Sequence, residues 1–292
     1  MVDNEAVNRA AFELLQRELP FLIHVPCAAH TIQLIVRSCL KHDRYASTAQ
    51  QLTDLIRHFD AKENRMALRR IQEARQLPVL AVLRPNDTRW SSTLLAAERM
   101  MRMRKEVETC YDQESLPSVD AAFFPALSAL IDFLKPFQVA TDIVQRDTST
   151  LFTVYETFIT LQRHVRDKDP TWAASRIIQR WEKNVNAPAT VACAILSFAR
   201  VPSGLSIQAA QDFIVHVGAA YLHYYHLCDD SAKLEDVQDA LLAQIAAFHG
   251  RTGRFASIEA QKNSFVRSSS GALNSRLVWL LYPDVELGKV AV

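Results

Sequence analysis

The sequence predicts a mainly α-helical fold with a short α/β fragment at its N-terminus. Only 6 of the 292 residues are Gly, and so few residues suited to positive φ argue against a hairpin-rich all-β fold. Apolar residues recur at helical spacing through most of the chain after residue 27, as in amphipathic helices. The chain is long enough for one large domain or two of medium size.

The α/β fragment is predicted from the first 27 residues. Apolar residues on one face predict a helix within residues 3–19, which Pro20 ends. The short run Phe21–Val25 is mostly apolar and bounded by prolines, as expected of an inner strand. Because a lone strand leaves its backbone groups without partners, we expect the remaining strands to lie outside this sequence.

Helical patterns follow in series. Ile32, Ile35, Val36 and Cys39 share one face of the first predicted helix. The later predicted elements are also helices, except around Leu77–Leu83, an apolar run that we expect to be a loop or a short strand. The predicted helices are 29–40, 48–59, 63–75, 90–110, 121–146, 150–166, 171–185, 189–200, 206–228 and 234–249. Residues 250–273 are weakly patterned, and Ser275–Tyr282 is apolar again.

The charge balance gives no whole-chain case for nucleic acid, because 33 Lys and Arg oppose 32 Asp and Glu. Any contact with DNA must therefore come from a local surface. Two basic segments, Arg57–Arg75 and Arg99–Lys105, are candidates, although each is equally typical of a solvated helix face. Five cysteines without paired spacing indicate free thiols in a reducing compartment. Neither a secretion signal nor a membrane span is expected.

Two motifs contain chemically useful residues. Cys27 and His30 lie three residues apart at the start of a predicted helix. They supply only half of a tetrahedral zinc site, and a buried His satisfied by a backbone carbonyl is the alternative. A second possible group, His223, His226 and Cys228, is more typical of helix packing. Arg89 and Trp90 lie at a loop-to-helix junction with Thr88 or Ser91 as the cap. Such a Trp is commonly a core anchor.

These motifs, in this order and preceded by Asp3-Asn4, resemble the hAT family of cut-and-paste DNA transposases. Asn8, the Leu94-Leu95-x-x-Glu98-Arg99 continuation and Leu134-Lys135-Pro136-Phe137 fit the same pattern, with Ser91 in place of the family's Asn. The resemblance implies a ribonuclease-H-like core interrupted by a large all-helical insertion. It assigns residues 1–27 to a truncated core, 28–270 to the insertion and 271–292 to a truncated return to the core.

The resemblance also implies roles for single residues. Asp3 would be one of three carboxylates that hold two Mg²⁺ or Mn²⁺ ions, although without the resemblance a helix cap is the preferred interpretation of this residue. Cys27 and His30 would lie near the active site and the DNA backbone, His30 positioning a phosphate or a carboxylate. Arg89 would contact a phosphate, and Trp90 would stack on a base turned out of the duplex.

Departures from the family pattern govern the expected activity. The first catalytic Asp would lie upstream of Asp3, and Glu286, the nearest candidate for the third carboxylate, has a different context. With one of three ligands we expect no bound metal and no catalysis. The family's dimerisation segment is also missing. The expected function is a fragment or domesticated derivative of a nuclear transposase with residual DNA binding. A helical protein-interaction module without a DNA role and an unrelated helical scaffold are the alternatives.

Overall fold

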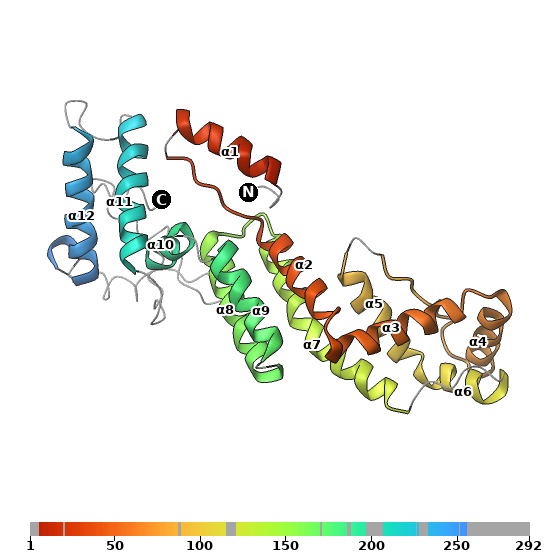
Figure 1. The fold of residues 1–292 in the computed structure, drawn as a ribbon. Coiled ribbons are helices and arrows are strands. Elements are labelled where there is room, and N and C mark those ends of the chain that lie inside the picture. Colours follow the sequence, from red (N-terminus) through yellow and green to blue (C-terminus); the bar gives the residue numbers. More distant parts are fainter. Residues whose placement is uncertain are drawn as a thin grey trace. The chain divides into compact units, whose positions relative to one another are not determined.

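The computed structural model describes residues 6–19, 21–86, 89–114, 121–169, 171–185, 188–196, 207–225, 227, 233–250 and 252–255. Within these ranges the chain is mainly α-helical, which confirms the predicted class (Figure 1). The helices are α1 (Ala6–Glu18), α2 (Ala28–Cys39), α3 (Asp43–His58), α4 (Lys62–Ala74), α5 (Ser91–Arg102), α6 (Arg104–Glu114), α7 (Phe123–Val144), α8 (Leu151–Lys168), α9 (Trp172–Arg180), α10 (Pro188–Leu196), α11 (Ile207–Tyr224) and α12 (Leu234–Gly250). A π-helical turn η1 (Trp181–Val185) and a 3-10 turn η2 (Gly253–Phe255) complete the described elements.

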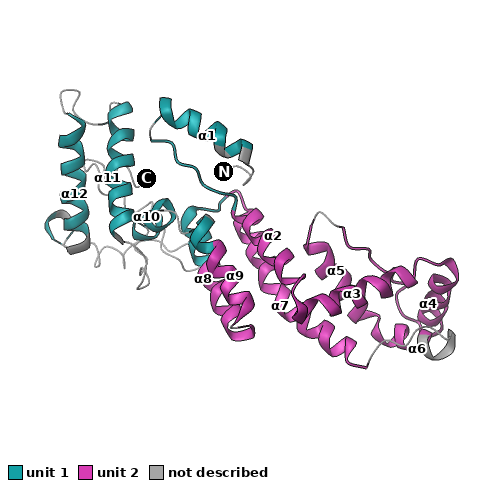
Figure 2. Cartoon of the chain, in the orientation of Figure 1, with its two compact units in different colours: residues 1–27, 148–156, 181–292 teal, residues 28–147, 157–180 magenta. Residues whose placement is uncertain are grey.

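The helices belong to two compact units (Figure 2). Unit 2 contains residues 28–147 and 157–180, and unit 1 contains residues 1–27, 148–156 and 181–292. Each unit has a core of its own.

Unit 2 is organised around α7, which packs against α2, α3 and α5, while α4 packs against α6. Phe123, Phe133 and Phe137 of α7 are fully buried, and burial of such rings is the main apolar stabilisation of a core. By length and hydropathy α7 is also the one described helix that would suit a membrane. Its contacts with three neighbouring helices are those of a core helix.

Unit 1 contains a smaller core formed by α10, α11 and α12, in which α11 packs against both of the others. Buried aliphatic side chains such as Ile214, Leu222 and Leu241 fill it, and Phe248 and Phe255 close one end. α11 has a neighbouring helix on each of two sides, as expected of a helix with apolar residues on more than one face.

The predicted strand at Phe21–Val25 is wrong. Phe21 lies in a turn, residues 22–25 have no regular structure, and only Pro26 forms an isolated bridge. The backbone groups are instead met locally: Leu22 donates to the Leu19 carbonyl at 3.0 Å, and Gln16 Nε2 donates to the Leu22 carbonyl at 2.7 Å. Phe21 packs on the rings of three tyrosines of the α11 end. The described residues therefore show no sheet, and the α/β part of the predicted fold class is not observed.

The long helix predicted at 90–110 is two helices. The chain turns at Met103, whose N–H donates to the carbonyls of Arg99 and Met100, and its side chain is 1% exposed. The turn separates α5, which packs on α7, from α6, which packs on α4. Helical propensity alone would continue the helix through Met103. The break therefore depends on the different helices that the two halves contact.

Candidate functional site

The most distinctive local structure in unit 2 is a non-helical segment, residues 77–86, which we call the strap. It begins with a sharp reversal after α4. Gln76 has φ 56°, its N–H donates to the Glu73 carbonyl, and the Leu77 N–H donates to the Gln72 carbonyl. These two bonds define a Schellman cap, in which a left-handed residue, usually Gly, ends a helix. Here Gln76 takes that position.

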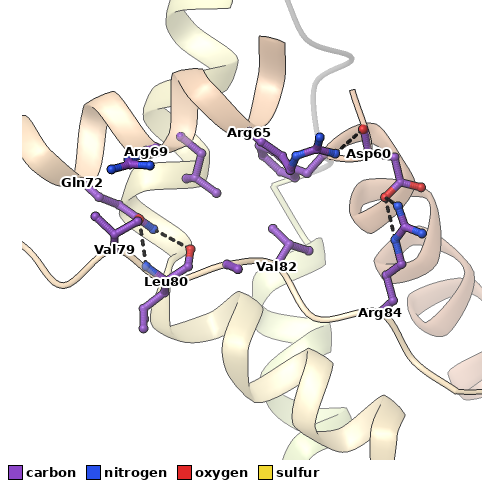
Figure 3. A pocket seen from close by; sticks show the side chains of 11 residues that line it. Asp60, Arg65, Arg69, Gln72, Val79, Leu80, Val82 and Arg84 are labelled. Atoms are coloured by element: carbon purple, nitrogen blue, oxygen red, sulfur yellow. Dashed lines mark hydrogen bonds and ion pairs between the residues drawn. The ribbon is translucent and has the colours of Figure 1, made fainter. Parts of the chain in front are cut away.

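Side chains then hold the strap along α4 (Figure 3). Gln72 Oε1 accepts from the Leu80 N–H at 3.0 Å, and its Nε2 donates to the Leu80 carbonyl at 3.3 Å. Further along, Arg84 binds Asp60 with Nη2 at 2.6 Å and Nε at 2.9 Å. Because these ties join later strap residues to earlier helix residues, the strap runs antiparallel to α4. Spanning about 15 Å of helix requires the strap to be nearly extended.

A third tie comes from α5. Arg99 Nη1 donates to the carbonyl of Ala81 at 2.8 Å. The strap therefore lies between the two basic segments that the sequence predicts, one containing α4 and the other ending α5. Both basic segments therefore contact the strap, and this proximity could not be inferred from their positions in the sequence.

An open pocket of about 280 Å³ lies between α4 and the strap. Its apolar lining comes from Phe59 and Leu68, both nearly buried, and from Val79 and Val82 of the strap. Its polar lining consists of Asp60, Gln72 and three arginines: Arg65, Arg69 and Arg84. Three cations thus oppose one carboxylate around an aliphatic floor.

Two of the three rim arginines, Arg65 and Arg69, have weak or replaceable partners. Arg65 donates to the backbone carbonyl of Asp60, and Arg69 pairs with Glu73 at 2.7 Å on the helix surface. The Arg69 and Glu73 side chains are 66% and 50% exposed, and pairs so exposed contribute little net free energy. A carboxylate or phosphate of a ligand can therefore compete for these two guanidinium groups.

Positive charge is concentrated in this part of the chain. From Arg57 to Lys105 there are twelve Lys or Arg and five Asp or Glu, a formal charge of +7, whereas the whole chain carries +1. The next acids partly offset this, because Glu106 pairs with Arg75 and Glu108 with Arg104. The face of α4 with Lys62, Arg65, Arg69 and Arg70 remains exposed to solvent.

Trp90 and Arg89 separate at the start of α5. The Trp90 side chain is 4% exposed, so its indole lies in the core and offers no free face to a base. Arg89 is exposed. Trp90 is the N-cap residue of α5 but makes no side-chain capping hydrogen bond. Ser91 is already helical and is therefore not the cap, and Thr88 lies outside the described residues. Ser92 Oγ instead binds the backbone of Asn86 and Arg89.

Cys27 and His30 flank the start of α2, and both are half-buried. Cys27 is not part of a disulfide bond. In the part of the chain that the structure describes, no three His, Cys, Asp or Glu residues lie where they could hold a metal ion. Asp3, Glu286, His226 and Cys228 fall outside that part, whereas His223 is exposed on α11.

A buried acid that sequence reasoning missed lies elsewhere in unit 2. Asp169, just before α9, is 2% exposed, and one oxygen lies 3.7 Å from Arg44. Burial raises the pKa of the Cys39 thiol to about 12, and the Asp169 charge acts in the same direction. Burial likewise raises the pKa of Tyr45 to about 12. Asp before a helix start is a capping signal, but nothing local predicts its burial.

Comparison of the chain with protein-family models, with curated proteins and with solved structures finds no match.

Proposed function

We propose that this chain is a helical DNA-binding protein derived from a hAT-type transposase, and that the cationic face of α4 contacts the phosphate backbone. The observation that carries the proposal is the exposed row Lys62, Arg65, Arg69 and Arg70 beside the strap arginine Arg84. The proposal is one of binding and not of strand transfer. Descent of residues 1–27 from a ribonuclease-H-like core, and action in the nucleus, rest on the sequence motifs alone.

The chemistry of the row suits a phosphate ligand. Guanidinium groups present paired donors that match phosphate oxygens, and they stay charged at any physiological pH. On α4, residues 62, 65 and 69 follow one another at about one helical turn, so their charges lie along one line. Phosphate contacts of this kind are independent of base sequence and position a protein on the backbone.

A charge-removal experiment tests this role. The variant Arg65→Gln/Arg69→Gln/Arg70→Gln removes three cations from α4, and Arg163→Gln/Arg166→Gln/Lys168→Gln removes three exposed cations from α8 as a matched control. Binding to a fluorescein-labelled DNA hairpin is followed by anisotropy between 50 and 200 mM salt. If each α4 residue contacts one phosphate, the negative slope of log affinity against log salt becomes shallower by about 3 in the α4 variant.

The control decides the interpretation. Retention of the parental slope by the α8 variant supports a contact specific to α4. Equal slopes for the two variants, or no binding by the parent at 50 mM salt, would contradict the proposal.

A further inference from the structure

We propose that the pocket between α4 and the strap binds a short acidic peptide in extended conformation. An aliphatic side chain of the peptide fills the pocket, and its flanking carboxylates pair with the rim arginines Arg65, Arg69 and Arg84. This partner is distinct from DNA, although it would share two arginines with the proposed DNA surface.

The lining of the pocket favours an aliphatic group over a nucleobase. Unpaired bases are held mainly by stacking on accessible aromatic rings. Phe59 is the one aromatic residue that lines this pocket, and it is 2% exposed, so its ring face is not available. The more exposed lining residues Val79, Leu80 and Val82 instead form an aliphatic surface, which suits a Leu, Ile or Val side chain.

Charge complementarity selects the flanking residues of the peptide. The lining residues, three guanidinium groups and one carboxylate, have a formal charge of +2, and Glu73, which pairs with Arg69 beside the pocket, lowers it to +1. Carboxylates on both sides of the inserted side chain would bind these donors bidentately. Like charges in the same positions would be repelled, which makes the preference for acidic peptides a matter of specificity as well as affinity.

The backbone of the strap is the reason that we expect the bound peptide to be extended. Gln72 occupies both backbone groups of Leu80. Neither Val79 nor Val82 has a backbone hydrogen bond to the part of the chain that the structure describes. In an extended segment Val82 presents its backbone groups on the same edge as Leu80, next to α4, so Val82 can pair with a second extended chain whose alternate side chains then point toward the adjacent pocket.

The test measures binding of the full chain to a fluorescein-labelled seven-residue peptide that alternates Glu and Leu. A peptide that alternates Glu and Ser has the same charge and no aliphatic groups. We expect the Glu/Leu peptide to bind at least about ten-fold more tightly, a difference of about 1.4 kcal/mol. No binding of the Glu/Leu peptide, or equal binding of the two peptides, overturns the proposal.

A pocket-filling variant separates this site from the DNA surface. Ala81 lines the pocket, so Ala81→Trp occupies it without removing a charge. Leu77→Trp adds the same ring on the exposed start of the strap, away from the lining. With unfolding temperatures confirming that both variants fold, only Ala81→Trp should weaken the Glu/Leu peptide, by about ten-fold. Affinity for the DNA hairpin should not change.

Two further outcomes keep the proposal falsifiable. Charge reversal in Arg65→Glu/Arg69→Glu should shift the preference to a peptide that alternates Lys and Leu, and this holds even if Ala81→Trp fails to fold. If Ala81→Trp instead weakens an oligothymidine strand and leaves the peptide unaffected, the pocket takes a base and the peptide assignment is wrong. Unchanged DNA binding in the arginine variants, together with loss of the acidic peptide, would count against the DNA proposal only.

Discussion

Gln72 binds the backbone of Leu80 with both ends of its side-chain amide, as a neighbouring strand would. The side chain donates to the Leu80 carbonyl at 3.3 Å and accepts from its N–H at 3.0 Å. Gln72 is 2% exposed, so these bonds are shielded from water and are correspondingly costly to lose. One residue of α4 therefore fixes the register of the strap that forms the pocket wall.

Replacement of this amide should loosen the strap. Gln72→Leu leaves the Leu80 N–H and carbonyl without partners, which should lower the free energy of unfolding by about 1–3 kcal/mol. Amide hydrogen exchange should accelerate more at Leu80, whose N–H loses its acceptor, than elsewhere. Gln50→Leu, which removes an exposed bond to Asp54 on α3, is the control. Equal stability and unchanged exchange in the Gln72 variant would show that the strap is held by other contacts.

The reversal before the strap contains a strained residue. Gln76 has φ 56°, a conformation that costs a side-chain-bearing residue about 1 kcal/mol relative to Gly. Because Gly in turn loses more chain entropy on folding, we expect Gln76→Gly to stabilise the chain by up to about 1 kcal/mol. Urea unfolding measures this directly. Gln76→Ala, which keeps the side-chain strain, should not stabilise, and stabilisation by both variants would exclude the backbone explanation.

Helix positions and buried faces could be read from the sequence because they depend on local periodicity. Residues 63–75 predict α4 to within one residue at each end, and Ile32, Ile35, Val36 and Cys39 are buried together as expected. The break at Met103 could not be read from the sequence, because both halves of the predicted helix have the apolar spacing of a helix. It exists because α5 and α6 contact different partners.

The same limit explains the strand error and the site. An apolar run between prolines fits a strand, but whether it pairs depends on neighbours that the local sequence does not specify. The two basic segments were recognisable from composition. The two segments meet at the strap because of the Schellman reversal at Gln76 and the buried amide of Gln72. Glutamine does not indicate either position, since a Gln in an amphipathic helix normally predicts a surface residue.

The position of Trp90 leads to a prediction that separates stability from DNA binding. Its indole is 4% exposed, so Trp90→Ala should lower the free energy of unfolding by about 3–5 kcal/mol. Trp90→Leu keeps an apolar group but no ring, and should be less destabilising. Below its unfolding temperature, the Leu variant should bind the DNA hairpin as tightly as the parent. A large loss of affinity without a loss of stability would instead show that the indole reaches a base.

The buried thiol of Cys39 should make stability depend on alkaline pH. Burial raises its pKa from 9.0 to about 12, so between these values the unfolded chain has lost a proton that the folded chain retains. The unfolded state then binds fewer protons, and stability falls as pH rises, by up to about 1.4 kcal/mol per pH unit from this group. Below pH 9 both states keep the proton, and the slope from Cys39 vanishes.

Cys39→Ala removes this thiol, whereas Tyr45, whose burial raises its pKa and gives the same trend at higher pH, is present in both proteins. Urea unfolding at pH 8, 9, 10 and 10.5 should show that the parent loses stability more steeply than the variant above pH 9. The variant starts from a lower value at pH 8, since a buried sulfur is removed, so the difference in unfolding free energy between the two proteins should narrow as pH rises. A difference that stays constant across this range would mean that the thiol ionises equally in the folded and unfolded chains, and that water reaches it beside Asp169.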